Sequence, residues 1–180
     1  ISCSLVGSEM CIRDRYETPR LLLKVLRADC APQVLDFYNR DKELFEMYEI
    51  DRVPDFYTVK HLQKVLRYEY NMAVKSQLFR FYVFEKENPC RIIGTVCIHN
   101  IAPAFYGSCE IGYKFSSEFH HMGYATEAVG FCTKLAFNEL RMHKVTAVVH
   151  PGNVPSMKLL NRLGFVPVSY THLRAHETAA

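Results

Sequence analysis

The chain has 180 residues, enough for one globular domain and too few for two. It is 49% hydrophobic and 23% charged, with no Trp but 11 Tyr and 12 Phe, which excludes a disordered, collagenous or coiled-coil protein. No apolar run approaches the ~20 residues that a membrane helix needs. The net charge of +3 is too small and too dispersed to indicate nucleic-acid binding. We therefore expect neither a membrane span nor a nucleic-acid partner.

Cysteine usage favours a reducing compartment. The seven Cys are an odd number without a CxxC pair or a regular spacing, so they do not indicate a disulfide framework. Cys109 and Cys132 lie on apolar segments, where a small buried hydrophobe is a better interpretation than a reactive thiol. We expect a cytoplasmic protein.

Both ends of the chain are predicted to be foreign to the protein. Leu5–Arg15 and Val168–Thr178 are what one DNA string encodes when it is translated directly and then as its reverse complement. That string resembles a transposase-type sequencing adapter, and such segments must be set aside before the fold is considered. We therefore expect residues 1–15 and 168–180 to be adapter-derived and residues 16–167 to hold the natural domain, with its own C-terminal strands missing.

The first half of this domain alternates a strand with helices. Leu21–Leu26 is a short apolar run that predicts a strand, and Asp29 or a neighbour is expected to cap the helix that follows. Thr58–Tyr70 has the apolar spacing of a second helix. Between the helices, Leu44–Tyr57 is irregular and rich in aromatic residues. Two interpretations of this segment are open, the wall of a binding cleft and ordinary packing.

The second half predicts an antiparallel meander followed by two more helices. The three strand-like runs are Phe79–Glu85, Arg91–His99 and Ser108–Phe115. A helix over about 125–136 follows, then a strand of buried type, Val145–His150, and a short helix, Ser156–Leu163, that ends at Gly164. These elements predict one α/β (α+β) domain with a mixed, mostly antiparallel sheet flanked by helices.

The most informative stretch is the loop between the last strand of the meander and the next helix. Gly123 at the helix start lets a ligand approach the main chain, and the free N–H groups of a helix start attract phosphate. A second strand, loop and capped helix, which carries Asn153 and Ser156, follows about thirty residues later. The pair of elements indicates a phosphate-bearing ligand more strongly than either element alone.

Together these residues resemble the GNAT family of acetyl-CoA-dependent N-acetyltransferases, and within it the RimJ/RimL-like branch that acetylates protein N-termini. The family's pyrophosphate loop is Arg or Gln, two residues, Gly, one residue, then Gly or Ala. The matching residues here are His120, His121, Met122, Gly123, Tyr124 and Ala125. His120 departs from the pattern, so a weaker phosphate contact is expected. The branch also has a Glu-Thr-Pro-Arg-Leu-like phrase, matched by Glu17–Leu21, and a Glu-Ile-Gly-Tyr strand, matched by Glu110–Tyr113.

The resemblance implies acetyl-CoA as the acyl donor and no metal. The pantetheine arm would lie in a gap between two splayed strands, here Ser108–Phe115 and Val145–His150. The implied cofactor-binding residues are Phe115, His120, His121, Met122, Gly123, Tyr124, Ala125 and Asn153. With the following strands missing, Val145–His150 is expected to expose an unpaired sheet edge.

Two residues are candidates for catalysis. Glu110 lies on the splayed strand and is the candidate general base, directly or through water; the alternative is a structural carboxylate that binds the substrate ammonium or a main-chain group. Ser156 is the candidate donor to the departing sulfur, and a helix N-cap is the alternative. Leu160 stands where many family members have a Tyr, so the usual phenolic acid is absent. Asn153 is expected to contact the pantetheine arm or to stabilise its loop.

We therefore expect an enzyme that transfers an acetyl group from acetyl-CoA to a primary amine by direct attack on the thioester. A protein N-terminal amine is the first choice of acceptor. Two alternatives stay open, namely acetylation of a small amine such as an antibiotic or a polyamine, and a non-catalytic CoA-binding module. The protein is expected to be a monomer or a homodimer.

Overall fold

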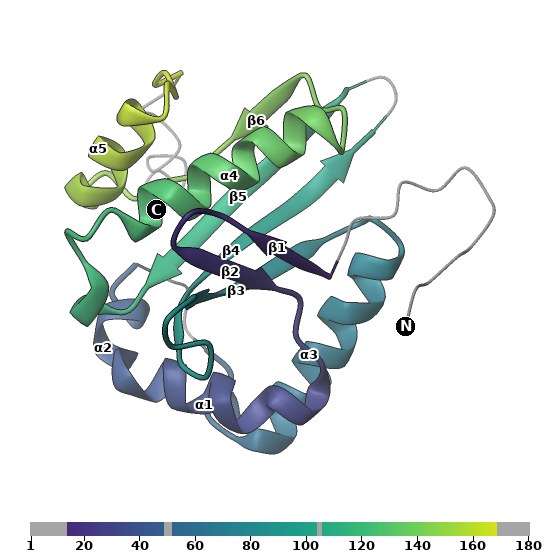
Figure 1. Ribbon diagram of the computed structural model, residues 1–180, viewed down its shortest axis with the longest axis vertical. Helices are drawn as coiled ribbons and strands as arrows, with labels where there is room; N and C mark the ends of the chain where they lie inside the picture. The colour runs from purple at the N-terminus through teal and green to yellow at the C-terminus, as the bar shows by residue number, and fades with distance from the viewer. Residues whose placement is uncertain (1–13, 49–51, 104–105, 169–180) are drawn as a thin grey trace, which may run out of the picture.

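Six strands form one sheet, in the order β1-β2-β3-β4-β5-β6, in the computed structural model (Figure 1). The structure describes residues 14–48, 52–103 and 106–168. Strand pairs are antiparallel from β1 to β5, and β6 joins β5 in parallel. The prediction of a mixed, mostly antiparallel sheet flanked by helices is confirmed. Predictions that concern residues 1–13 and 169–180, most of the two proposed adapter segments, lie outside the described residues.

The strands of the meander lie where the sequence predicts them. The six strands are β1 (Arg15–Glu17), β2 (Leu21–Lys24), β3 (Phe79–Glu85), β4 (Ile92–Ala102), β5 (Ser108–Phe115) and β6 (Lys144–Thr146). β3 and β5 have the predicted bounds, whereas β2 ends two residues early. β1 was not predicted; it pairs with β2 as a hairpin whose turn is closed by a hydrogen bond from Thr18 N to Leu21 O (3.0 Å).

The predicted strand Val145–His150 is wrong in its length. β6 pairs with β5 through three residues only, and the backbone from Ala147 to His150 is no longer extended in the sheet. The pairing ends because the two strands diverge after Glu110 and Thr146. β6 is the last strand in the sheet order among the described residues, and Val148 just beyond it is 87% exposed.

The helices cover both faces of the sheet. They are α1 (Ala31–Arg40), α2 (Lys42–Glu46), α3 (Val59–Val74), α4 (Tyr124–Asn138) and α5 (Val154–Arg162), with 3₁₀ turns η1 (Ala28–Cys30) and η2 (Ser117–Phe119). Thr58 caps α3 by accepting a hydrogen bond from His61 N (3.1 Å). The predicted cap at Asp29 is wrong: η1 runs directly into α1, and Cys30 at the N-cap position makes no side-chain cap bond.

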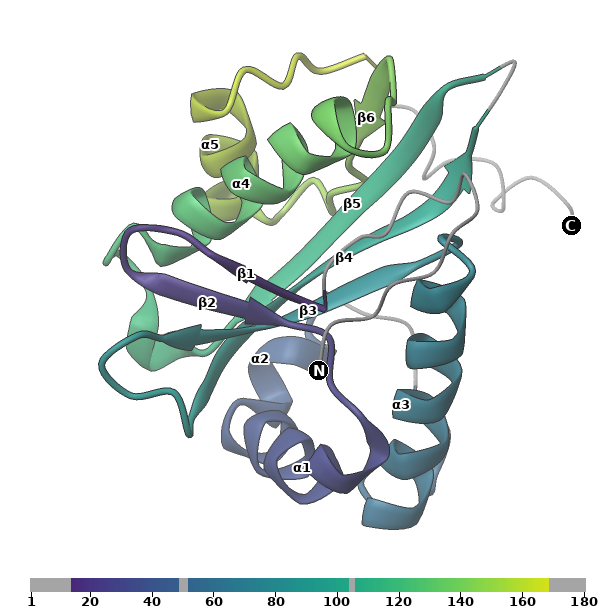
Figure 2. The ribbon, with the colours of Figure 1, turned by 45° about the vertical axis from the view of Figure 1, so that its right-hand side comes forward.

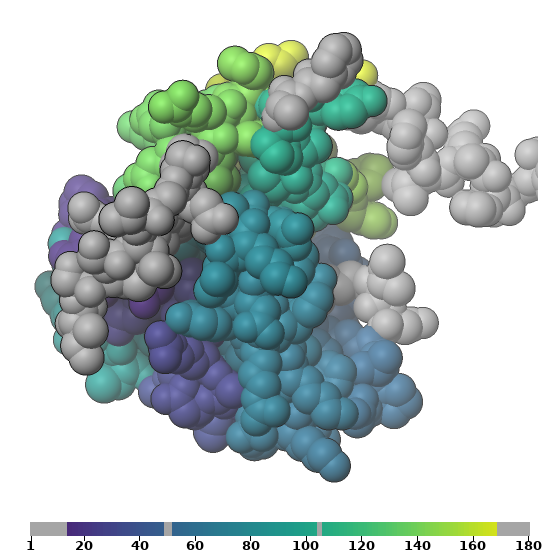
Figure 3. All heavy atoms as spheres, turned by 90° about the vertical axis from the view of Figure 1, so that its right-hand side faces the viewer, coloured from purple at the N-terminus to yellow at the C-terminus, as the bar shows by residue number. Residues whose placement is uncertain are grey.

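Two cores hold these layers together. Side chains on one face of the sheet pack with α4, and side chains on the other face pack with α1 and α3 (Figures 1 and 2). α3 covers much of the face that Figure 3 shows. Alternation along β5 places Cys109 and Ile111 in the α4 core, so Glu110 points to the α1–α3 face. In the described part of the chain, no helix is both long and apolar enough to cross a membrane.

Candidate active site

β6 pairs with only the first three residues of β5, and we call the unpaired stretch beside the rest of β5, which ends near the start of α4, the gap. The two strands pair at Ser108, Cys109 and Glu110, but β5 continues to Phe115 without a β6 partner in the described residues. The backbone groups on that side of β5 are therefore not engaged by β6 and can pair with an extended ligand. The pairing of the two strands ends after Glu110 and Thr146, and the insertion of a pantetheine arm beside β5 stays a prediction.

Glu110 occupies the last paired position before the gap. It stands between His99 of β4 and Thr146 of β6, and its side chain is partly exposed. The β4 register shifts between His99 and Ala102, where Asn100 has a φ of 49°. Such bulges bend a strand and redirect side chains, and they are common next to active sites. A Cβ built on Gly112 would meet only the His99 Nε2 atom, at 3.8 Å, so the same face has room beside Glu110.

The loop from β5 to α4 presents backbone donors. Gly123, the N-cap residue of α4, has a φ of 79°, which a side chain would strain. The first main-chain bond of α4 runs from Glu127 N to Gly123 O (3.0 Å), so the N–H groups of Tyr124, Ala125 and Thr126 precede any helical acceptor. An anion at this helix start would meet several aligned N–H groups.

Two of the predicted cofactor residues make contacts within the protein, His120 from an exposed position and Phe115 from a buried one. The His120 Nε2 atom lies 3.0 Å from the Phe115 carbonyl oxygen, so this ring closes the end of β5. The Phe115 ring is buried over Gly94, where a Cβ would come within 2.4 Å of it. His121 and Met122 are exposed on the loop, and His121 also has a positive φ, 63°. The loop's ligand-facing groups are therefore mainly backbone.

Asp41, between α1 and α2, anchors the same loop from the opposite side. Its Oδ1 atom accepts hydrogen bonds from Ser117 N (3.1 Å) and Ser117 Oγ (2.5 Å), and Ser116 Oγ donates to Oδ2. Burial alone would raise the pKa of Asp41, but the hydrogen bonds from the two serines outweigh it and lower this pKa. Sequence reasoning did not find this anchor, since Asp41 has no motif around it.

Ser156 lies across the gap from β5 and touches a phenol. The Tyr113 hydroxyl and Ser156 Oγ are 2.6 Å apart, and either atom can be the donor. Burial raises the pKa of Tyr113, and its bond to Ser156 opposes part of that rise. The N-cap interpretation of Ser156 is wrong, because Asn153 holds that position and its Oδ1 accepts from Ser156 N (3.1 Å). The Ser156 hydroxyl is thus available for another role. Tyr113 was visible in its motif, but nothing in the sequence paired it with Ser156.

The α1–α3 face beside Glu110 carries a buried ion pair. Glu69 of α3 is 6% exposed and accepts from Arg80 Nε (2.5 Å) and from the Tyr82 hydroxyl (3.2 Å). Arg80 lies in the row of Cys97 and Gly112, two residue pairs along the sheet from the row that contains His99 and Glu110. This pair ties α3 to β3 and gives the face a fixed shape.

Packing accounts for part of the aromatic segment Leu44–Tyr57. Its first part is helical, as α2, and Phe45 is buried against Phe37 and Tyr38. Tyr48, just after α2, is exposed, and its ring lies 5.8 Å from the ring of His150 in the loop before α5. Packing therefore accounts for Phe45, and the interpretation of the segment as the wall of a binding cleft stays a prediction. Residues 49–51 are outside the described part.

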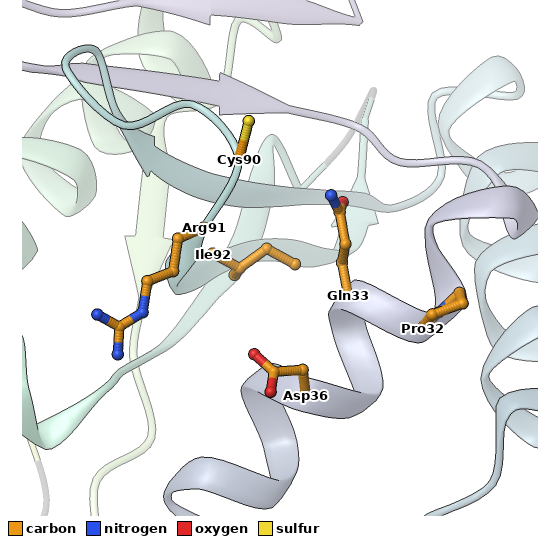
Figure 4. Close-up of a pocket in the computed structure, with 6 residues that line it drawn as sticks. All are labelled: Pro32, Gln33, Asp36, Cys90, Arg91 and Ile92. Carbon is orange, nitrogen blue, oxygen red and sulfur yellow. The ribbon is translucent and has the colours of Figure 1, made fainter.

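A shallow hollow lies elsewhere, between α1 and the start of β4. It measures about 300 Å³, and Figure 4 shows Gln33 and Asp36 projecting from α1 toward the segment that carries Cys90 and Arg91. None of the predicted site residues lines it. It has no feature that would serve acyl transfer.

Titratable side chains elsewhere show no metal or thiol site. In the ranges that the structure describes, no group of three or more His, Cys, Asp or Glu side chains could hold a metal ion. Cys109 and Cys132 are buried in the α4 core, as predicted, and burial raises the pKa of the Cys109 thiol to about 11. Neither thiol is suited to nucleophilic catalysis.

Comparison with known proteins matches this geometry to one family. The family described as "Acetyltransferase (GNAT) domain" matches residues 20–166. The probable N-acetyltransferase YjcK of Bacillus subtilis is 29% identical over 145 residues, which cover 81% of this chain and 80% of that protein.

Solved structures show the same fold. The ribosomal-protein-S5-alanine acetyltransferase of Vibrio fischeri superposes with a TM-score of 0.79 at 25% identity, over 84% of this chain and 82% of that one. Mycobacterium smegmatis RimJ, solved in complex with CoA-disulfide, gives a TM-score of 0.77 at 22% identity, over 83% of this chain and 71% of that one.

Proposed function

Since the chain belongs to the GNAT family of acetyltransferases, we propose that it transfers the acetyl group of acetyl-CoA to the N-terminal amine of a protein. The observation that carries the proposal is the gap between β5 and β6, with Glu110 at its closed end and the start of α4 at its open end. Pantetheine is long and extended, and a pyrophosphate is an anion, so acetyl-CoA suits a gap that ends at a helix N-terminus. Structural neighbours that bind CoA support this choice.

The proposed reaction needs a base on one side of the thioester and a proton donor on the other. Glu110 takes one proton from the acceptor ammonium, directly or through water, and the free amine attacks the carbonyl carbon. A C–N bond forms, the C–S bond breaks, and the sulfur takes a proton from the Ser156 hydroxyl. Ser156 recovers its proton from Tyr113, whose phenol lies 2.6 Å away. The new amide nitrogen then loses its second proton, which returns to the Tyr113 oxygen. Glu110 releases the first proton to solvent, so the reaction yields one proton overall.

A protein N-terminus as acceptor is supported by likeness to ribosomal-protein acetyltransferases. The Vibrio fischeri enzyme with the same fold is named for the alanine of ribosomal protein S5. The face beside Glu110 also has room at Gly112, which suits the end of a chain. An acceptor of this kind occurs in the cytoplasm, where we place the protein.

The test is release of CoA thiol from acetyl-CoA with matched acceptors. One peptide has a free N-terminus and no Lys, a second is the same peptide with a blocked N-terminus, and a third acceptor is a polyamine. Release with the free peptide alone is expected. Thiol release with the polyamine alone would show that the acceptor is a small amine and not a protein N-terminus. CoA binding without thiol release in the presence of any amine would indicate a binding module.

A further inference from the structure

The turn between β1 and β2 is hydrogen-bonded to the first turn of α4, although the two are more than 100 residues apart in the chain. Glu127 Oε1 accepts hydrogen bonds from Thr18 Oγ1 (2.6 Å) and Arg20 N (2.9 Å), and Glu127 Oε2 accepts from Arg20 Nε (2.7 Å). The Glu127 side chain is only 15% exposed. Three hydrogen bonds from the hairpin therefore engage both oxygens of this carboxylate.

Arg20 extends this contact to the loop itself. Its Nη1 atom donates to the Met122 carbonyl oxygen (2.9 Å), and its guanidinium lies 4.5 Å from the centre of the Tyr124 ring. Its Nη2 atom is 3.3 Å from the point that a Cβ on Gly123 would occupy. Tyr124 is held in turn by a hydrogen bond from its hydroxyl to Glu85 of β3 (2.6 Å). One side chain thus contacts three consecutive residues of the loop.

The contact with Met122 fixes the direction of a backbone donor. In a trans peptide the C=O of one residue and the N–H of the next point in opposite directions. Because the Met122 carbonyl points at Arg20, the Gly123 N–H points away from Arg20 and from the β1–β2 hairpin. This is the glycine whose left-handed backbone the loop requires.

The ion pair also removes an unfavourable charge. Burial would raise the pKa of Glu127, but hydrogen bonds from Thr18 and Arg20 lower it, so the carboxylate is ionised at neutral pH. An unpaired carboxylate in the first turn of α4 would repel a diphosphate placed there. Arg20 compensates this charge at a distance of 2.7 Å.

We propose that Arg20 is a positioning residue for the pyrophosphate of the cofactor, acting through the Gly123 N–H and through the charge of Glu127. This inference rests on the proposed function, which supplies the identity of the ligand. The family's Arg or Gln at the first loop position is His120 here, and His120 is engaged with Phe115. Arg20, a cation on the β1–β2 hairpin, is therefore expected to contribute more to pyrophosphate binding in this chain.

The experiment compares two acyl donors. Acetyl-CoA carries the pyrophosphate, whereas S-acetylpantetheine has the same thioester and arm without it. For Arg20→Ala we expect the KM for acetyl-CoA to rise about tenfold with kcat within about twofold, and no change with S-acetylpantetheine. Arg20→Lys should recover part of the loss, because it keeps the charge but not the paired donors. Arg27→Ala is the matched control: Arg27 also stacks on and bonds to a tyrosine, Tyr70, but touches no loop residue.

Calorimetry separates this inference from the proposed function. CoA should bind Arg20→Ala about tenfold more weakly than the wild type, whether or not any amine is acetylated, and thermal melts should show that both variants are folded. An equal loss with both donors would mean that Arg20 only stabilises the fold. Unchanged CoA affinity in a folded Arg20→Ala variant would overturn the inference.

Discussion

The β5–α4 and β6–α5 connections, which border the gap, differ in the contacts that hold them. The β5–α4 connection is held from three sides, by Asp41 on Ser117, by Arg91 on Glu118 and by Arg20 on Met122. The β6–α5 connection follows a strand of three residues and includes Val148, which is 87% exposed. Its contacts include hydrogen bonds from Asn153 N to His150 O (2.8 Å) and from Gly152 N to His150 Nδ1 (3.1 Å) and the ring contact with Tyr48, and none of these is an ion pair.

This difference indicates which part of the site is formed before the ligand binds. A loop held in a left-handed backbone by charged side chains can receive an anion without further ordering, and pre-organisation of this kind favours affinity. Cofactor binding should therefore depend on the first connection, whereas turnover should depend on Glu110 and Tyr113 of β5 and on Ser156 of α5.

The largest effect is expected at Gly123. Gly123→Val should lower CoA affinity by about a hundredfold or more, because a side chain strains the backbone at a φ of 79° and occupies the approach to the helix start. Calorimetry with CoA measures this. Gly164→Val is the matched control, since Gly164 has a φ of 84° with nothing within 4 Å of its Cβ position and lies after α5. CoA affinity near wild type in a folded Gly123→Val variant would place the cofactor elsewhere.

The next effect tests the closed end of the gap. Glu110→Gln should lower kcat by about a hundredfold and leave CoA affinity near wild type, as is typical for loss of a proton-transfer group. The pH profile of kcat/KM distinguishes a base from an ammonium-binding carboxylate. If Glu110 is the base, its protonation causes a fall of kcat/KM at low pH, and this fall should be absent from Glu110→Gln. Wild-type turnover at all accessible pH values would show that solvent deprotonates the amine.

A smaller effect is expected across the gap. Ser156→Ala and Tyr113→Phe should each lower kcat by about tenfold, and the double variant should be little worse than either, because the two hydroxyls act in series. A donor with a more acidic thiol should reduce both losses, since its sulfur leaves without a proton. Losses that add fully, or that the donor does not change, would assign the pair to packing of α5 on β5.

The sequence predicts the local parts of this molecule well. The bounds of β3 and β5 follow from their alternation and turns, and the start of α3 follows from the apolar spacing after Thr58. Gly123 was identified from its place between a strand and a helix. Each of these features depends on residues that are close together in the chain.

The missed features depend on contacts between distant residues. Arg20 and Glu127 are 107 positions apart, and Tyr113 and Ser156 are 43 apart. The short length of β6 also depends on where β5 turns away from it, which no alternation in residues 145–150 encodes. The assignment of Ser156 as an N-cap failed because Asn153 competes for the same position.

Hydrogen exchange with and without CoA tests the central claim most directly. We expect CoA to slow amide exchange in residues 121–126 and 111–115, which border the gap, and to leave residues 62–74 of α3 unchanged as an internal control. Protection confined to the hollow near Pro32 and Ile92, or no protection at a saturating CoA concentration, would contradict a cofactor site between β5 and β6.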